Sequence, residues 1–252
     1  ACFHDLWDRW VTVPEPLALD VLDVGCGIGT MSLEVLRMGH RPVGVDFSPE
    51  ALVVARELAV EEGYEYRLIE HDVAAIGSLD DLPRFQVAVC FDIIEHLHDD
   101  ELGGMLYGVR RHLADGAKVL FMTTPTWFSH LFDNLDGDWQ LVRQAAMNSL
   151  QLAPGDFDKW IRRQALIDEE NLMHMRGVEY RERIKMMPHC NPTTTHRLTD
   201  IFKRAGYEFD DLFSGNLKTA VQNMAFYLPQ YPILHSHIWG VAHIACDKNA
   251  TL

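Results

Sequence analysis

VLDVGCGIGT, residues 21–30, reads as an apolar strand that runs into a glycine loop and then into a helix. Glycines at positions 25, 27 and 29 allow a tight turn and let a ligand approach the backbone without meeting a Cβ atom. A dinucleotide-binding loop has the spacing G-x-G-x-x-G, whereas Thr30 takes the place of the third glycine here. No Gly-Lys-Ser/Thr follows, which excludes a phosphate-binding P-loop. The carboxylate of Asp23 would repel a pyrophosphate, so the loop predicts a ligand that carries an ammonium or sulfonium cation.

Acidic residues also stand where the next three predicted strands end. These strands are predicted over residues 42–46, 66–70 and 85–91. Asp46 lies 17 residues after Gly29, where a βαβ unit places a carboxylate within reach of two ribose hydroxyls. Asp72 is placed to accept a hydrogen bond from an adenine amino group, and Asp92 follows the fourth strand. The carboxyl ends of parallel strands meet at one edge of a sheet, so these acids are predicted to share one ligand.

These four strand ends resemble the class I S-adenosylmethionine (SAM)-dependent methyltransferases, most closely over residues 20–125 and again from Thr195 to Tyr207. The segment IIEHL at 93–97 is similar to one in ubiquinone-biosynthesis O-methyltransferases and RNA 3′-end methyltransferases. The resemblance implies that Asp23 and Gly25 hold the methionine part of SAM, while Phe91 and Asp92 line its methyl-donor end. The cofactor-binding residues that it implies are Asp23, Gly25, Gly27, Gly29, Asp46, Phe47, Asp72, Val73, Phe91 and Asp92.

The alternation of strand and helix predicts an α/β fold, and the resemblance makes it Rossmann-like, with a seven-stranded, mostly parallel sheet and helices on both faces. Strands are predicted over residues 21–25, 42–46, 66–70, 85–91, 118–124, 208–213 and 240–247, and helices over 30–38, 49–62, 99–113 and 191–205. Gly116 is predicted as a C-cap-like stop after the third helix. Around Leu6, Trp7 and Trp10 we expect one or two amphipathic turns.

Regularity stops after Pro125, and the stretch that follows is too long for an ordinary loop. We predict a core over residues 1–125, a helical cap over 126–191 that is inserted after the fifth strand as a substrate lid, and a return to the core over 192–252. Seven acids and seven bases balance within residues 156–187 of the cap, which is typical of a solvated helix. The aromatic stretch 214–239 is expected to form a second wall of the substrate pocket, a hydrophobic flap over the sheet edge, or a contact in a homodimer.

Net charge and cysteine spacing limit the classes of binding partner and the cellular compartment that the sequence predicts. A formal net charge of −15 over 252 residues disfavours nucleic acid, whose binding depends on clustered lysine and arginine. Five scattered cysteines without a C-x-x-C pair predict free thiols and a cytoplasmic protein. No apolar run is long enough to span a bilayer. The predicted partner is therefore a small-molecule methyl acceptor.

Several histidines gather near the predicted pocket. Methyl transfer needs a base only when the acceptor is a hydroxyl or another weak acid, and histidine suits that task near neutral pH. His96 is the first candidate catalytic base and His196 the second. The alternative for His96 is a histidine at a helix start that is bonded to backbone.

A divalent metal is a further hypothesis. Asp92, Glu95 and His96 have a spacing that resembles the metal ligands of RNA-end and ubiquinone methyltransferases, with Asp in the place of a Glu. His189 or His196 would complete the set, which suits Mg²⁺ or Mn²⁺ and, less well, Zn²⁺. The alternative is a metal-free enzyme.

The leading prediction is a SAM-dependent methyltransferase that acts on a small molecule, at a hydroxyl oxygen ahead of nitrogen or carbon. Three alternatives stay open on the sequence: methylation of an RNA 3′-terminal ribose, a nicotinamide-dependent oxidoreductase, and a SAM-binding interaction protein without catalysis. The acidic charge counts against RNA, and Thr30 with Asp23 counts against the nicotinamide cofactor.

Overall fold

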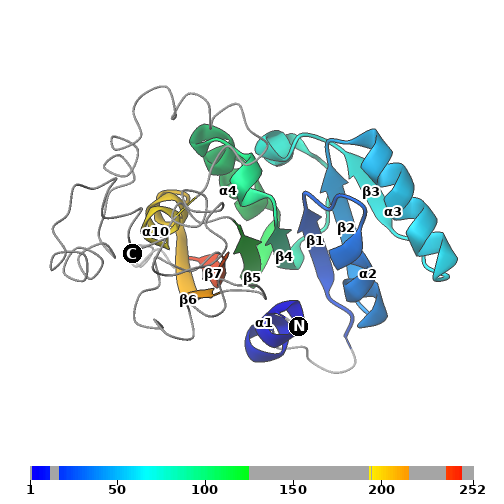
Figure 1. Cartoon of the computed structure of the whole chain (residues 1–252), viewed down its shortest axis with the longest axis horizontal. Helices are drawn as coiled ribbons and strands as arrows, with labels where there is room; N and C mark the ends of the chain where they lie inside the picture. Colours follow the sequence, from blue (N-terminus) through cyan, green and yellow to red (C-terminus); the bar gives the residue numbers. More distant parts are fainter. Residues whose placement is uncertain (1, 12–16, 125–192, 194, 216–236, 246–252) are drawn as a thin grey trace, which may run out of the picture. The chain divides into compact units, whose positions relative to one another are not determined.

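The computed structural model describes residues 2–11, 17–124, 193, 195–215 and 237–245. A seven-stranded sheet has the order β3-β2-β1-β4-β5-β7-β6 (Figure 1). The strands are β1 (Asp20–Val24), β2 (Arg41–Asp46), β3 (Arg67–Glu70), β4 (Phe85–Phe91), β5 (Leu113–Thr123), β6 (Tyr207–Gly215) and β7 (His237–Ile244). The helices are α1 (Cys2–Trp10), α2 (Thr30–Arg37), α3 (Pro49–Glu61), α4 (Asp99–His112) and α10 (Thr195–Arg204), with 3₁₀ helices η1 (Val73–Ser78) and η2 (Ile94–His96).

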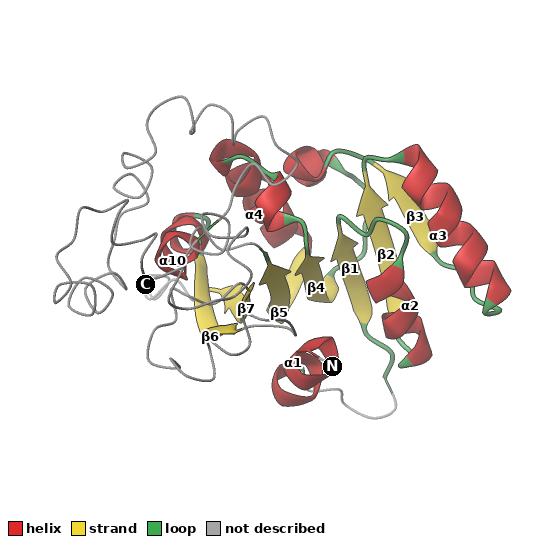
Figure 2. Cartoon of the chain, in the orientation of Figure 1, coloured by secondary structure: helices red, strands yellow, loops and turns green. Residues whose placement is uncertain are grey.

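The first five strands form the parallel core of the sheet. β1 pairs in parallel with β2 and β4, β2 with β3, and β4 with β5. The central strands β1 and β4 are mostly apolar and buried at all but their end positions and Gln86, as expected where both faces of a parallel sheet are covered. Figure 2 shows the helices that connect these strands along the chain. The predicted Rossmann-like fold with seven mostly parallel strands is confirmed.

Contacts along the chain divide it into two compact units, one of residues 1–122, 201–211 and 240–252 and the other of residues 123–200 and 212–239. These boundaries differ from the predicted division at 125 and 191. The predicted helical cap, residues 126–191, lies outside the residues that the structure describes. The helix predicted at 191–205 is present as α10.

The last two strands complete the sheet with β7 between β5 and β6. A Cβ atom at Gly240 would lie 2.5 Å from the ring of Phe121 and 2.9 Å from the carbonyl oxygen of Asp211, so only glycine fits between the neighbouring strands there. The Asp210 carboxylate accepts hydrogen bonds from Lys118 Nζ at 2.8 Å and from His243 Nδ1 at 3.1 Å. One side chain on β6 thus links β5 to β7.

Gly116 differs from its prediction. The third predicted helix ends at His112, and the chain enters β5 at Leu113 without a glycine cap. Gly116 lies inside β5 with φ +76°, in the interval where the register against β4 shifts between Phe85 and Val87. Glycine is therefore used there for a bulge in the strand rather than for the end of a helix.

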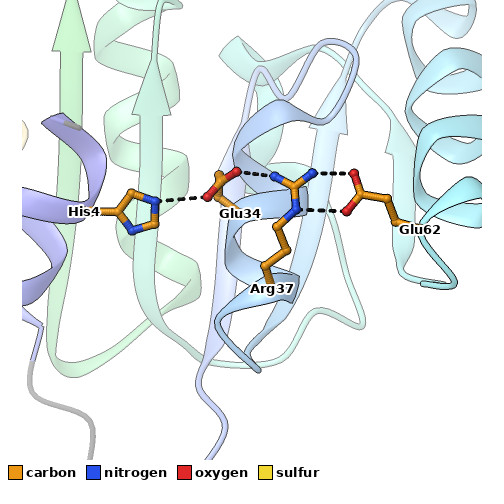
Figure 3. A network of polar contacts seen from close by, with 4 residues as sticks. All are labelled: His4, Glu34, Arg37 and Glu62. Carbon is orange, nitrogen blue, oxygen red and sulfur yellow. Dashed lines mark hydrogen bonds and ion pairs between the residues drawn. The ribbon is translucent and has the colours of Figure 1, made fainter.

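Helix α1 packs one apolar face onto the rest of its unit. Phe3, Leu6 and Trp7 are buried, and the Trp7 ring stacks on His40 with 5.0 Å between centroids. His4 on the polar side contacts Glu34 at 3.0 Å, and Figure 3 shows how the contact continues through Arg37 to Glu62. The amphipathic turns predicted near the N-terminus are therefore a helix that is attached to α2. No helix among the described residues is long and apolar enough to cross a membrane.

Candidate cofactor site

The glycine loop between β1 and α2 uses its three glycines for different purposes. All three have positive φ, at +70°, +51° and +81° for Gly25, Gly27 and Gly29. A Cβ atom at Gly25 would lie 2.7 Å from the side chain of Ile93, and one at Gly29 would collide with the hydroxyl of Tyr66. A Cβ at Gly27 would meet nothing within 4 Å. Two glycines therefore pack the loop against the protein, and Gly27 leaves open space for a ligand.

Asp46 fixes the open part of this loop. Its Oδ2 accepts a hydrogen bond from the Gly27 backbone N–H at 2.8 Å, and its Oδ1 accepts one from the Ser48 N–H at 2.9 Å. Only 8% of the residue is exposed. Each carboxylate oxygen has a second lone pair, so the group keeps acceptor capacity for two ribose hydroxyls. Ser48 caps α3 through its bond from the Ala51 N–H, as the sequence predicted.

Asp23 lies beneath the loop rather than on its surface. It is 2% exposed, and its Oδ2 accepts a hydrogen bond from the Ser32 hydroxyl at 2.7 Å. Burial raises its pKa to about 6, the bond from Ser32 opposes that shift, and the nearby Asp46 charge adds to it. A cation bound above the loop would favour the charged form of this carboxylate. Asp23 therefore suits a cationic ligand through the field that it creates.

Three further residues support the loop, and the sequence did not point to them. Ser32 stands in the first turn of α2, while Tyr66 reaches the loop from the residue just before β3. Gly44 on β2 makes room for Cys26, since a Cβ there would lie 2.8 Å from the Cys26 sulfur. The role of Gly44 follows from the pairing of β1 with β2. None of the three has a local sequence signal, because each role depends on contacts between distant segments.

Asp72, the acidic residue after β3, lies at the start of η1, and η1 makes a close contact with α4. Asp72 caps η1 through the bond that its Oδ1 accepts from the Ala74 N–H at 2.9 Å, and Val73 is buried. Gly108 on α4 is so close to Gly77 on η1 that a Cβ would lie 2.5 Å from the Gly77 nitrogen. Helix α4 thus sets the position of η1 and of Asp72.

Comparisons with known proteins agree with this geometry. Residues 21–116 match a methyltransferase-domain family. The chain is 31% identical over 166 residues to the ubiquinone biosynthesis O-methyltransferase of Alkalilimnicola ehrlichii, with 64% of each chain covered. It is 28% identical over 179 residues to that of Serratia proteamaculans, with 70% of this chain and 68% of the relative covered. The chain thus spans about two thirds, or less, of the length of these curated relatives.

Solved structures share the fold. A SAM-dependent methyltransferase from Methanosarcina mazei superposes with a TM-score of 0.58 at 16% identity, covering 96% of this chain and 98% of the other. The glycopeptide N-methyltransferase MtfA in complex with SAM gives a TM-score of 0.54 at 12% identity, covering 96% and 92%. Residues 21–116 therefore form a methyltransferase domain, and the chain has the fold of class I SAM-dependent methyltransferases. The open space at Gly27 and the held carboxylate of Asp46 fit SAM in that domain.

Other predicted contacts of the methyltransferase domain lie around this loop. Phe47, which follows Asp46, is 71% exposed, so its ring is available to a ligand. Phe91 at the end of β4 is half-buried and packs edge-on against Phe3 of α1, with 5.8 Å between centroids. These positions agree with the predicted cofactor contacts.

The segment after β4 does not form the predicted metal site. Asp92 and His96 are exposed, whereas Glu95, in the same short helix η2 as His96, is 1% exposed. No group of three or more His, Cys, Asp or Glu side chains that could hold a metal occurs among the described residues. Because η2 turns Glu95 inward and leaves His96 outward, the spacing in sequence does not become convergence in space. The described residues therefore do not form a metal site by themselves, and the side chains of the two histidines predicted to complete one, His189 and His196, lie outside the described residues.

Some of the remaining candidate residues lie outside the residues that the structure describes. His96 ends η2, where its N–H donates to the Ile93 carbonyl at 3.0 Å, and its exposed side chain stays a candidate base. His196 lies in the first turn of α10, and its side chain is outside what the structure describes. His189, the other distal ligand considered for the metal, and the stretch 216–236 also lie outside the described residues.

Proposed function

We propose that this protein transfers the methyl group of SAM to a hydroxyl oxygen of a small molecule. The observation that carries the proposal is the open space over Gly27 beside a carboxylate that is already oriented by two backbone N–H groups. The similarity to ubiquinone biosynthesis O-methyltransferases supports oxygen as the acceptor atom. A net charge of −15 favours a small acceptor over RNA.

The chemistry asks little of the protein beyond position. Methyl transfer from a sulfonium is an in-line displacement, in which the acceptor oxygen forms a bond to carbon as the carbon–sulfur bond breaks. Most of the acceleration comes from holding donor and acceptor in a near-attack geometry. A hydroxyl acceptor also loses a proton, and we propose the exposed His96 as the base that takes it.

Calorimetry with SAM, S-adenosylhomocysteine and NAD tests the donor. We expect SAM and S-adenosylhomocysteine to bind and NAD not to bind. Asp46→Ala should weaken SAM by roughly tenfold to a hundredfold, because it removes about 1.5–3 kcal/mol of charged hydrogen bonding. Asp20→Ala is the matched control, since Asp20 lies at the other end of β1 and pairs with the exposed Arg41. Binding of NAD alone, or equal SAM affinity in Asp46→Ala, would overturn the assignment.

Product analysis tests the acceptor. The protein is incubated with methyl-labelled SAM and a panel of small phenols, catechols, amines and an RNA oligonucleotide, and products are identified by mass spectrometry. We expect label on a hydroxyl oxygen of a small aromatic substrate, and His96→Gln to lower kcat with little change in SAM affinity. Label on RNA alone would replace the proposed acceptor.

A further inference from the structure

Tyr66 is the residue under the glycine loop whose presence the packing does not explain. Its hydroxyl oxygen is buried and has no hydrogen-bond partner of good geometry. A buried polar atom without a partner costs free energy, and a phenylalanine would fill the same space without that cost. Burial raises the pKa of Tyr66 to about 12, while the Ser32 side chain beside it opposes the shift. The hydroxyl therefore keeps its proton at neutral pH and has it available to donate.

The neighbours of this hydroxyl belong to the cofactor loop. It lies directly under Gly29, at the place that a Cβ of that residue would occupy. Ser32, one turn into α2, already donates its own proton to Asp23 Oδ2 at 2.7 Å. The Ser32 oxygen is thus an acceptor placed between the tyrosine hydroxyl and the aspartate. A hydrogen bond from the Tyr66 hydroxyl to the neighbouring Ser32 oxygen would complete a chain from Tyr66 through Ser32 to Asp23.

We propose that Tyr66 is a positioning residue for the cofactor, which acts through Ser32 on the Asp23 carboxylate when SAM is bound. This inference rests on the proposed function. In the chain, Tyr66 donates to Ser32 and Ser32 donates to Asp23, so both protons support the negative charge. A cation above the loop favours that same charge. The bound cation and Tyr66 therefore both stabilise the charged form of Asp23.

Other charged and titratable groups face Asp23 and do not replace this role. Asp46 on β2 and the Cys26 and Cys90 thiols are its neighbours. Burial raises the pKa values of both thiols well above their usual range, so both stay neutral, and Asp46 repels the Asp23 charge. Among the groups described around Asp23, Ser32 donates a hydrogen bond to its carboxylate, and Tyr66 is the donor placed beside Ser32.

SAM affinity measured by calorimetry between pH 5 and pH 8 tests the proposal on the full chain. Wild-type affinity should fall about tenfold from pH 7 to pH 5 as Asp23 takes up a proton in the free protein. Tyr66→Phe should weaken SAM roughly fivefold to tenfold at pH 7 and hardly at all at pH 5, so the two curves converge in acid. Ser32→Ala should lose at least as much at pH 7, because it also removes the bond that Ser32 donates to Asp23 in the free protein, and adding Tyr66→Phe to it should cause no further loss.

Tyr207→Phe is the matched control. Its hydroxyl is also buried, but it donates to the Leu106 carbonyl at 2.8 Å in the core. We expect that variant to melt at a lower temperature with unchanged SAM affinity, whereas Tyr66→Phe melts at the same or a higher temperature with weaker affinity. Unchanged affinity in Tyr66→Phe, or a loss that is equal at every pH, would overturn the positioning role. Absence of SAM binding by the wild type would overturn the proposed function, and this inference with it.

Discussion

The loop after β1 and the segment after β4 both carry acidic residues at the carboxyl ends of parallel strands, yet they are built in opposite ways. In the first, Asp23 and Asp46 are buried, and each accepts hydrogen bonds in the described structure. In the second, Asp92 is exposed with φ +53°, and Glu95 and His96 turn to different sides. Among the described residues, the second contains no group of three or more side chains that could hold a metal.

The difference teaches where local sequence carries functional information. Positive φ at three glycines is a backbone requirement, and it fixes the path of the first loop whatever its neighbours are. The directions of side chains after β4 depend on one short turn, η2, whose form the spacing of Asp92, Glu95 and His96 does not determine. The glycine pattern therefore predicted the course of the loop, and the acid spacing predicted a metal site that the described residues do not contain.

The largest expected effect separates two glycines of the same loop. Gly29→Ala should lower the free energy of unfolding by about 2–5 kcal/mol, since it adds a left-handed alanine and a collision with Tyr66. Gly27→Ala should cost only about 1–2 kcal/mol of stability, because its Cβ has open space. The SAM affinity of Gly27→Ala should instead fall at least about tenfold, because the added Cβ would occupy space proposed for the ligand. Urea unfolding and calorimetry on both variants give the two numbers.

Equal stability losses in the two glycine variants would contradict the division of roles in the loop. The same holds if Gly27→Ala bound SAM as well as the wild type, because the open space would then not be the ligand's path. Gly63→Ala is a control for the cost of positive φ alone, since Gly63 has φ +80° and no neighbour within 4 Å, after α3.

Asp23→Asn should show the next largest effect, and its sign depends on pH. The folded-state pKa of Asp23 is about 6 and its ordinary value is 3.8, so the folded protein holds the proton more tightly. Stability from this group is present below pH 4 and is lost as pH rises through 6. The neutral asparagine avoids the loss and should raise the free energy of unfolding by about 1–3 kcal/mol at pH 8, with the gain vanishing near pH 4. A gain that did not change with pH would rule out this explanation.

The seam between α4 and η1 gives a smaller effect. Gly108→Ala should lower stability by about 1–2 kcal/mol, because overpacking against Gly77 exceeds the gain in helix propensity. Gly103→Ala, on the open side of the same helix, should raise stability by about 0.5–1 kcal/mol. Thermal melts of the two variants check the pair. Stabilisation of Gly108→Ala would mean that α4 and η1 are not in close contact.

The smallest expected effect concerns the segment after β4. Because Asp92, Glu95 and His96 do not converge on a metal in the described structure, we expect SAM affinity and methyl transfer to be unchanged by EDTA. Turnover with and without chelator, and after adding Mg²⁺, Mn²⁺ or Zn²⁺, measures this. A loss of activity in EDTA that one of these ions restores would show that ligands beyond the described residues complete a site.

Much of the fold was predictable because its signals are local. Strand β1, the glycine loop and the Ser48 cap of α3 each follow from a few adjacent residues, and all three are present as predicted. Gly116 was assigned to a helix end because a glycine after a helix has that role most often, whereas its place in β5 depends on the register with β4. Tyr66 and Ser32 were missed for the same reason, since their roles arise only when β3 lies beside β2 and α2 closes over β1.

Backbone amide shifts followed by NMR during a SAM titration test the central claim most directly. We predict the largest changes at the Gly27 and Ser48 amides, because both donate to the Asp46 carboxylate that the ribose would engage. The amides of Gly103 and Gly116, which lie outside this site, should not move. Saturating SAM with no change at Gly27 and Ser48, or with changes confined to Glu95 and His96, would contradict the account.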